Sequence, residues 1–138
     1  MLNPAKSFID LVVWQKAHEF VLQLYRFTDR FPRAEIFALT TQMRRAAVSI
    51  PANISEGFGK RTTPEKLRFL NIAQGSLEES KYYLILSRDL RYGDVEKLQV
   101  MLETVSKLLA AYQRAISRVA YPKRKVKRRT AKPKRNRH

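Results

Sequence analysis

The stretch from Asp94 to Ala120, DVEKLQVMLETVSKLLAAYQRAISRVA, decides the fold class. Its apolar residues recur every three or four positions, which is the spacing that places side chains on one face of an α-helix. Asp94 follows Gly93 and suits an N-cap, and Tyr121-Pro122 ends the pattern. A helix with one apolar face must pack against other helices. The stripe comprises Leu98, Met101, Leu102, Val105, Leu108, Leu109, Tyr112, Ile116 and Val119.

Upstream of Gly93, residues 63–90 predict another long helix. Thr63 is a suitable N-cap, Pro64 suits the first helical position, and Glu65 complements the positive end of the helix dipole. The apolar residues of this segment form two stripes rather than one. The first comprises Leu67, Leu70, Ala73, Leu77 and Leu84, and the second Phe69, Ile72, Tyr83, Leu86 and Leu90.

Residues 40–56 predict a shorter helix whose apolar positions fall within a narrow arc. Pro51 lies inside this pattern, and because proline lacks an N–H and clashes with the preceding turn, we expect a bend there without a helix end. Gly57 and Gly59 are expected to terminate the helix. The core-facing residues would be Met43, Ala46, Ala47, Ile50 and Ile54.

Residues 10–29 predict the first helix, with Asp10 as N-cap and Phe31-Pro32 as the stop. Four helices joined by short connections predict an all-α fold, an antiparallel up-and-down four-helix bundle. With 138 residues and 44% apolar residues, one domain with a real core is expected. The expected organisation is an N-terminal segment (1–9), the bundle (10–121) and a disordered basic tail (122–138).

The formal net charge of +16 is distributed unevenly. Residues 123–138 contain ten Lys or Arg and no acid, which leaves 18 basic and 12 acidic residues in 1–122, a net charge of +6. A block of like charge that is poor in apolar residues commonly binds nucleic acid. The alternative is a solubility tail that binds any polyanion. The tail residues that we expect to contact phosphates are Lys123, Arg124, Lys125, Lys127, Arg128 and Arg129.

The residues needed for catalysis or metal binding do not form recognisable patterns. There is no cysteine, and His18 lacks the Glu-x-x-His pairing of di-metal bundles, so we expect a half-buried or interface histidine and no metal. Glu56 and the pair Glu78-Glu79 are expected to face solvent or to pair with arginine rather than to act as general bases. We therefore expect no enzyme activity and no cofactor. The start of the chain lacks a signal-peptide pattern and no segment could span a bilayer, so a cytoplasmic location is expected.

Basic residues of the bundle are the remaining candidates for a site. The candidate nucleic-acid-binding residues are Arg44, Arg45, Lys60, Arg61, Lys66 and Arg68. The last four surround the start of the helix at 63–90, and a helix N-terminus attracts anions. The alternative is a solvated face with ion pairs to Glu56 and Glu65.

Three segments resemble the family of four-helix-bundle proteins encoded by intervening sequences in bacterial 23S ribosomal RNA genes. The segments are 8–17 (FIDLVVWQKA), 39–59 (LTTQMRRAAVSIPANISEGFG) and 69–79 (FLNIAQGSLEE), and the similarity extends in order over about residues 7–120. The resemblance implies a four-helix bundle without catalytic residues. The family is similar to accessory proteins of diversity-generating retroelements, which form pentameric rings, bind nucleic acid and associate with a reverse transcriptase.

Two functional hypotheses follow. The first is a non-catalytic, oligomeric nucleic-acid-binding protein, with RNA or DNA held mainly through phosphates. The second is a protein-interaction scaffold that docks a partner enzyme such as a reverse transcriptase.

We also expect a homo-oligomer, with a pentamer favoured, because two helices carry a second apolar stripe that would be sticky if left in water. The alternative is a monomer whose aromatic residues lie over the edges of the bundle. The expected interface residues are Val13, Phe20, Phe27, Phe31, Phe69, Ile72, Tyr83 and Leu86.

Overall fold

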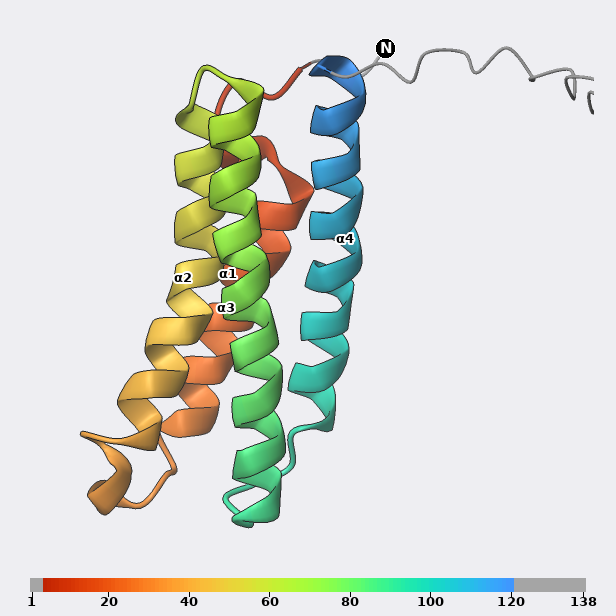
Figure 1. Cartoon of the computed structure of the whole chain (residues 1–138). Helices are drawn as coiled ribbons and strands as arrows, with labels where there is room; N and C mark the ends of the chain where they lie inside the picture. The colour runs from red at the N-terminus through yellow and green to blue at the C-terminus, as the bar shows by residue number, and fades with distance from the viewer. Residues whose placement is uncertain (1–3, 121–138) are drawn as a thin grey trace, which may run out of the picture.

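Four amphipathic helices, joined by short connections, form an antiparallel up-and-down bundle (Figure 1). The computed structural model describes residues 4–120, and this part of the chain contains helices and no strand. The helices are η1 (Phe8–Asp10), α1 (Val12–Thr28), η2 (Arg33–Glu35), α2 (Leu39–Gly59), α3 (Thr63–Asp89) and α4 (Glu96–Ala120). The predicted fold class is confirmed for the bundle. The predicted tail lies outside the described residues.

The helix starts differ by one or two residues from the sequence expectation. Asp10 does not cap α1; it belongs to η1, where its carboxylate accepts hydrogen bonds from the backbone N–H groups of Lys6 (3.0 Å) and Ser7 (3.2 Å). Thr62, rather than Thr63, is the N-cap of α3, and its hydroxyl accepts from the N–H of Glu65. Asp94 acts as expected, since its carboxylate accepts from the N–H of Glu96 at 3.0 Å.

Helix α2 continues through Pro51 to Gly59, so the expectation that the helix persists beyond the proline is confirmed. The expectation that Gly57 ends it is wrong. A Cβ on Gly57 would lie 3.2 Å from the carbonyl oxygen of Lys66 and 3.3 Å from Cβ of Phe69, both on α3. Gly57 therefore lets two helix backbones approach closely at the turn between α2 and α3.

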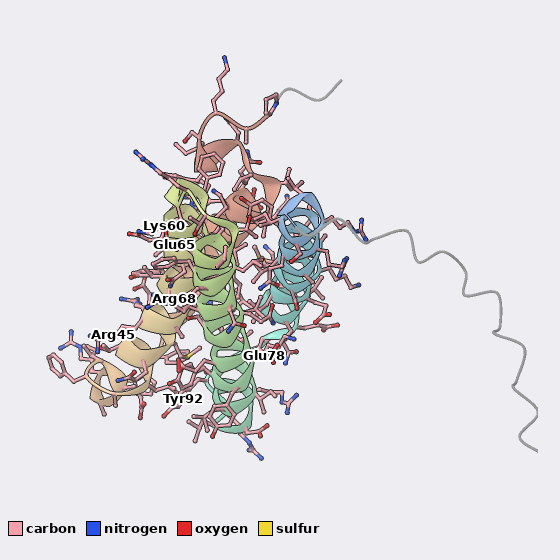
Figure 2. The ribbon with its side chains drawn as sticks, turned by 45° about the horizontal axis from the view of Figure 1, so that its top comes forward. Arg45, Lys60, Glu65, Arg68, Glu78 and Tyr92 are labelled. Carbon is pink, nitrogen blue, oxygen red and sulfur yellow. The ribbon has the colours of Figure 1, made fainter. Side chains whose placement is uncertain are left out.

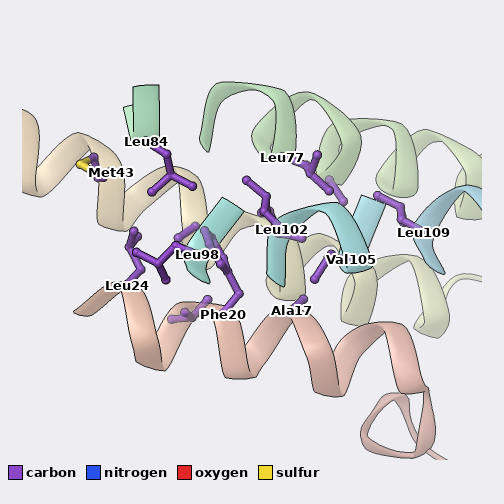
Figure 3. Packing of buried hydrophobic residues seen from close by; sticks show 14 of the residues in the cluster. Ala17, Phe20, Leu24, Met43, Leu77, Leu84, Leu98, Leu102, Val105 and Leu109 are labelled. Atoms are coloured by element: carbon purple, nitrogen blue, oxygen red, sulfur yellow. The ribbon is translucent and has the colours of Figure 1, made fainter. Parts of the chain in front are cut away.

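The core runs along the centre of the bundle and draws on all four helices (Figure 3). In α3 the buried residues recur every three or four positions, which keeps one face of the helix inside. Figure 3 shows Phe20 and Leu24 of α1 facing Leu98 and Leu102 of α4. The fully buried large side chains include Phe20, Leu24, Met43, Ile50, Ile54, Leu70, Leu77, Leu84, Leu102 and Leu109.

Three of the expected interface residues belong to this core, so their assignment to a subunit interface is wrong. Val13, Phe20 and Phe31 are all buried within the chain. Helix α1 contacts both α2 and α4, so it needs an apolar arc wide enough for two neighbours. The two stripes on α1 are the two halves of that arc, and a single chain absorbs both.

The other five expected interface residues differ in how far they are buried. Phe27, Tyr83 and Leu86 are half-buried and pack against the core. Burial raises the pKa of the Tyr83 hydroxyl, with smaller contributions from Glu79 and Tyr82. Phe69 is half-buried, and Ile72 is exposed, with 42% of its surface accessible. Ile72 is thus the expected interface residue that a second subunit could reach most directly.

Candidate nucleic-acid interface

The up-and-down topology gathers basic residues at one end of the bundle. The end of α2, the start of α3 and the end of α4 all lie there (Figure 1). A surface pocket of about 280 Å³ is lined by Thr63 and Lys66 of α3 and by Ala115, Ile116 and Val119 of α4, so these two helix ends are direct neighbours. Two segments that are 50 residues apart in the sequence therefore contribute to one surface.

We call this surface the basic end. Its acidic residues are Asp10, Glu56 and Glu65. The sequence continues from Ala120 into the ten cations of 123–138, which lie outside the described residues together with the predicted contacts from Lys123 to Arg129. The cations of the basic end are Lys6, Lys60, Arg61, Lys66, Arg68, Arg114 and Arg118.

Two of the predicted cations make contacts within the chain. The ammonium of Lys66 donates to the carbonyl oxygens of Phe58 (2.8 Å) and Gly57 (3.4 Å), and so caps the C-terminal end of α2. Lys60 lies 4.0 Å from the carboxylate of Glu56, and its ammonium is 5.0 Å from the ring centre of Phe69. Lys66 is therefore a structural residue as well as a charge.

Arg61 and Arg68 are the more accessible members of the predicted group. Both side chains are exposed. Arg68 lies beside Phe69, with its guanidinium carbon 5.8 Å from the ring centre. Figure 2 shows Lys60, Glu65 and Arg68 close together on the α2–α3 side of the bundle. Arg61 and Arg68 can each turn toward a phosphate without breaking an ion pair of the described chain.

Arg44 holds helices α1 and α2 together. Its Nε donates to the hydroxyl of Thr28 (2.9 Å), its Nη2 lies 2.9 Å from the carboxylate of Asp29, and its guanidinium carbon is 4.4 Å from the ring centre of Tyr25. Only 27% of its side chain is exposed. These contacts assign a structural role to Arg44.

Arg45, the next residue of α2, is exposed and lies nearer the other end of the bundle (Figure 2). Fifteen residues separate it from Lys60, which corresponds to about 22 Å along the helix. The six predicted cations are therefore not brought together into one site. Sequence reasoning also missed Lys6, Arg114 and Arg118, because only the bundle topology shows that they share an end with Lys60.

Replacing Arg44 with methionine is expected to lower the free energy of unfolding by about 1–3 kcal/mol, because the hydroxyl of Thr28 loses a charged donor and two helices lose their link. Arg45→Met is the matched control and should change stability by less than about 0.5 kcal/mol. Urea denaturation of both variants provides the measurement. Equal losses for the two variants would contradict the structural role of Arg44.

The other side chains considered for chemistry are on the surface. Glu56, Glu78 and Glu79 are exposed, as expected, and Glu78 pairs with a lysine, Lys81, at 3.3 Å rather than with an arginine. His18 is exposed rather than half-buried. Within residues 4–120, no group of three or more His, Asp or Glu side chains is placed to hold a metal ion. No helix of the described region has the length and apolarity needed to cross a membrane.

The opposite end of the bundle offers a useful comparison. A surface pocket of about 230 Å³ is lined there by Arg26 of α1 and Arg30 just after it, and by Asp94 just before α4 and Lys97 within it. These cations are exposed, but the acidic Asp94 lies among them. No cationic segment of the sequence follows this end. Removing the same number of cations here is therefore a control for removing them from the basic end.

Comparisons with known proteins place the chain in a family. A protein with unknown function from the S23 ribosomal protein family of Bacteroides thetaiotaomicron, whose crystal structure is known, is similar to it with a TM-score of 0.69 and 25% sequence identity. The match covers 75% of this chain and 96% of that protein. No curated protein matches the chain. Residues 9–113 match the model of the 23S rRNA-intervening sequence protein family, and the chain therefore belongs to that family.

Proposed function

We propose that the chain is a non-catalytic protein that binds nucleic acid through the phosphates at its basic end. The observation that carries this proposal is the meeting of the α2–α3 turn with the C-terminal end of α4, from which the ten cations of 123–138 continue. Seven cations and three acids of the described chain lie at that end. A strongly positive surface next to a polycationic segment attracts a polyanion over a long range.

Binding through phosphates would depend strongly on salt and weakly on base sequence. The binding constant falls with salt because each neutralised phosphate releases condensed counterions, with a logarithmic slope of about −0.9 per contact for duplexes and about −0.7 for single strands. Phosphate contacts position a protein on nucleic acid but carry no sequence information. The expected behaviour is therefore similar affinity for different sequences and a steep salt dependence.

A charge-removal experiment tests the proposal. Changing Arg61, Arg68, Arg114 and Arg118 together to glutamine should lower RNA and DNA affinity roughly tenfold or more and reduce the salt slope by up to about 3.6 for a duplex and about 2.8 for a single strand. The control changes Arg26, Arg30, Arg33 and Lys97 to glutamine, which removes the same charge from the opposite end. Fluorescence anisotropy over a salt series measures both quantities. Equal effects of the two variants would show that net charge, rather than the basic end, determines binding.

Deleting residues 123–138 is the second arm of this experiment. We expect RNA and DNA affinity to fall by similar factors and the salt slope to flatten, since ten cations are removed. Unchanged affinity and slope would show that these residues are not an electrostatic arm.

A protein-interaction scaffold is the second candidate, and one observation favours it. Phe37, between η2 and α2, is 95% exposed, and Ile36 beside it is also exposed. A large apolar side chain in water is a typical anchor for a protein partner. Apolar docking resists salt, whereas phosphate binding does not, so Phe37→Ser combined with a salt series separates the two candidates.

Homo-oligomerisation remains part of the proposal, with a pentamer favoured, and the exposed apolar side chain of Ile72 on α3 supports it. An assembly would repeat the basic end and convert weak phosphate contacts into a multivalent surface. Light scattering at micromolar concentration gives the mass directly. A mass of about 16 kDa would reject the oligomer.

A further inference from the structure

Three aromatic side chains stack on one another at the beginning of α1. The rings of Phe8 and Trp14 meet edge to face, with ring centres 5.1 Å apart and planes inclined by 61°. The imidazole of His18 lies nearly parallel to the indole of Trp14, at 5.1 Å and 11°. Trp14 is half-buried and packs against the core, so the stack has a fixed base. His18 is exposed and forms its outer layer.

The stack begins near the basic end, at Phe8, and extends from there along α1, where His18 lies six residues, or about 9 Å, beyond Val12. Trp14 and His18 belong to the first two turns of α1, and α1 begins where α2 ends. The short helix η1, which carries Phe8, contacts both α1 and α2. Lys6 lies two residues before this helix, and Lys60 and Arg61 directly follow α2. The stack therefore begins at the end of the molecule that carries these cations.

The outer face of His18 is open to a further planar group. Among the described residues, Trp14 is the single ring that stacks on it. The next aromatic residue along the same side of α1 is Tyr25, whose ring is covered by the guanidinium of Arg44. The platform consequently offers one position, next to His18, rather than a continuous track along the helix.

We propose that the Trp14–His18 pair stacks on an unpaired base of single-stranded nucleic acid whose phosphates are held at the basic end. The inference rests on the proposed function and deepens it, since it names the class of nucleic acid. Every base has a π-face, so stacking tolerates any sequence, in keeping with phosphate-driven binding. Bases inside a duplex are already stacked on both faces and cannot use the platform. A single-stranded ligand is therefore preferred over a duplex.

Charge favours a nucleic acid over a second copy of the chain as the occupant of this surface. The basic end carries seven cations and three acids, so the basic ends of two copies repel each other, whereas a polyanion is attracted. The half-buried Trp14 holds the ring of His18 in a stacked position. A ring that is already positioned loses little conformational freedom when a base binds, which adds to this preference.

The single tryptophan of the chain makes the test direct. The full-length protein is titrated with a uridine 12-mer, which has little structure of its own, and with a 12-base-pair RNA duplex at the same salt concentration. We expect the single strand to quench Trp14 fluorescence and the duplex to leave it nearly unchanged. His18→Ala should weaken binding of the single strand roughly 5-fold to 150-fold, the equivalent of about 1–3 kcal/mol per stacked base, and leave duplex affinity unchanged.

Two control variants accompany His18→Ala. His18→Phe keeps a ring on Trp14 and should restore single-strand affinity, which an ionic role of His18 would not allow. Leu22→Ala changes an exposed residue one turn further along α1 and should have no effect on either ligand.

The outcomes separate this inference from the proposed function. If the protein binds both ligands and His18→Ala changes neither or both equally, the stacking platform is overturned while nucleic-acid binding stands. If neither ligand binds, the proposed function fails, and the platform fails with it. If His18→Ala instead changes the mass measured by light scattering, the surface is a protein interface and the platform is overturned.

Discussion

Replacing Phe20 with alanine is expected to lower the free energy of unfolding by about 3–5 kcal/mol, because the change removes a large ring from a close-packed core and leaves a cavity. The side chain has no exposed surface. Figure 3 shows it beside Leu24 and facing α4. Urea denaturation monitored by circular dichroism measures the loss. Leu22→Ala on the same helix, where the side chain is 46% exposed, should cost less than about 1 kcal/mol.

The Phe20 result also distinguishes a core residue from an interface residue. The stability lost on removing a core residue does not depend on protein concentration, whereas loss of an interface contact does. We therefore expect the same difference between wild type and Phe20→Ala at low and high protein concentration. A variant that keeps its stability but dissociates would return Phe20 to the subunit interface.

Replacing Gly57 with leucine is expected to destabilise the bundle by about 1–3 kcal/mol or more, because even a Cβ at this position meets the backbone of α3. The carbonyl of Lys66 and the Cβ of Phe69 cannot move away without shifting the helix. The same substitution at Gly75 is the control, since a Cβ there has no neighbour within 4 Å. Gly75 is exposed within α3, so Gly75→Leu should raise stability by up to about 1 kcal/mol through helix propensity.

Thermal and urea unfolding of the two glycine variants provide the comparison. If both variants are stabilised, α2 and α3 are further apart at this turn than the structure indicates. Because Lys60 and Lys66 are placed by the same turn, Gly57→Leu should also weaken nucleic-acid binding, whereas Gly75→Leu should not.

The number and type of helices could be predicted from the sequence because apolar spacing reports helical faces directly. Which apolar residues face the core of the chain itself and which could face a second subunit could not be predicted. On α1, spacing alone does not distinguish two separate stripes from one wide arc that contacts two neighbours, and Phe20 was therefore placed at an interface. The position of Gly57 inside α2 was missed for a related reason, since a glycine that ends a helix and a glycine that permits close packing look alike in a sequence.

The candidate site was predictable in part. Arg61 and Arg68 are exposed at the end where the sequence placed an anion-binding group. The role of Arg44 depends on Thr28 and Asp29, which lie on another helix and have no pairing signal in the sequence. The contribution of Arg114 and Arg118 depends on bundle topology. The His18–Trp14 stack follows from side-chain orientation, which residue spacing permits but does not determine.

The even number of helices has a practical consequence for labelling. Because the chain crosses the bundle four times, α1 begins and α4 ends on the same side of the molecule (Figure 1). A tag fused before residue 4 or directly after Ala120 would sit beside the basic end and could obstruct it. The connections between α1 and α2 and between α3 and α4 lie about 37 Å away, the length of the 25-residue helix α4. A fluorophore or surface tether attached at one of these connections would leave the basic end accessible.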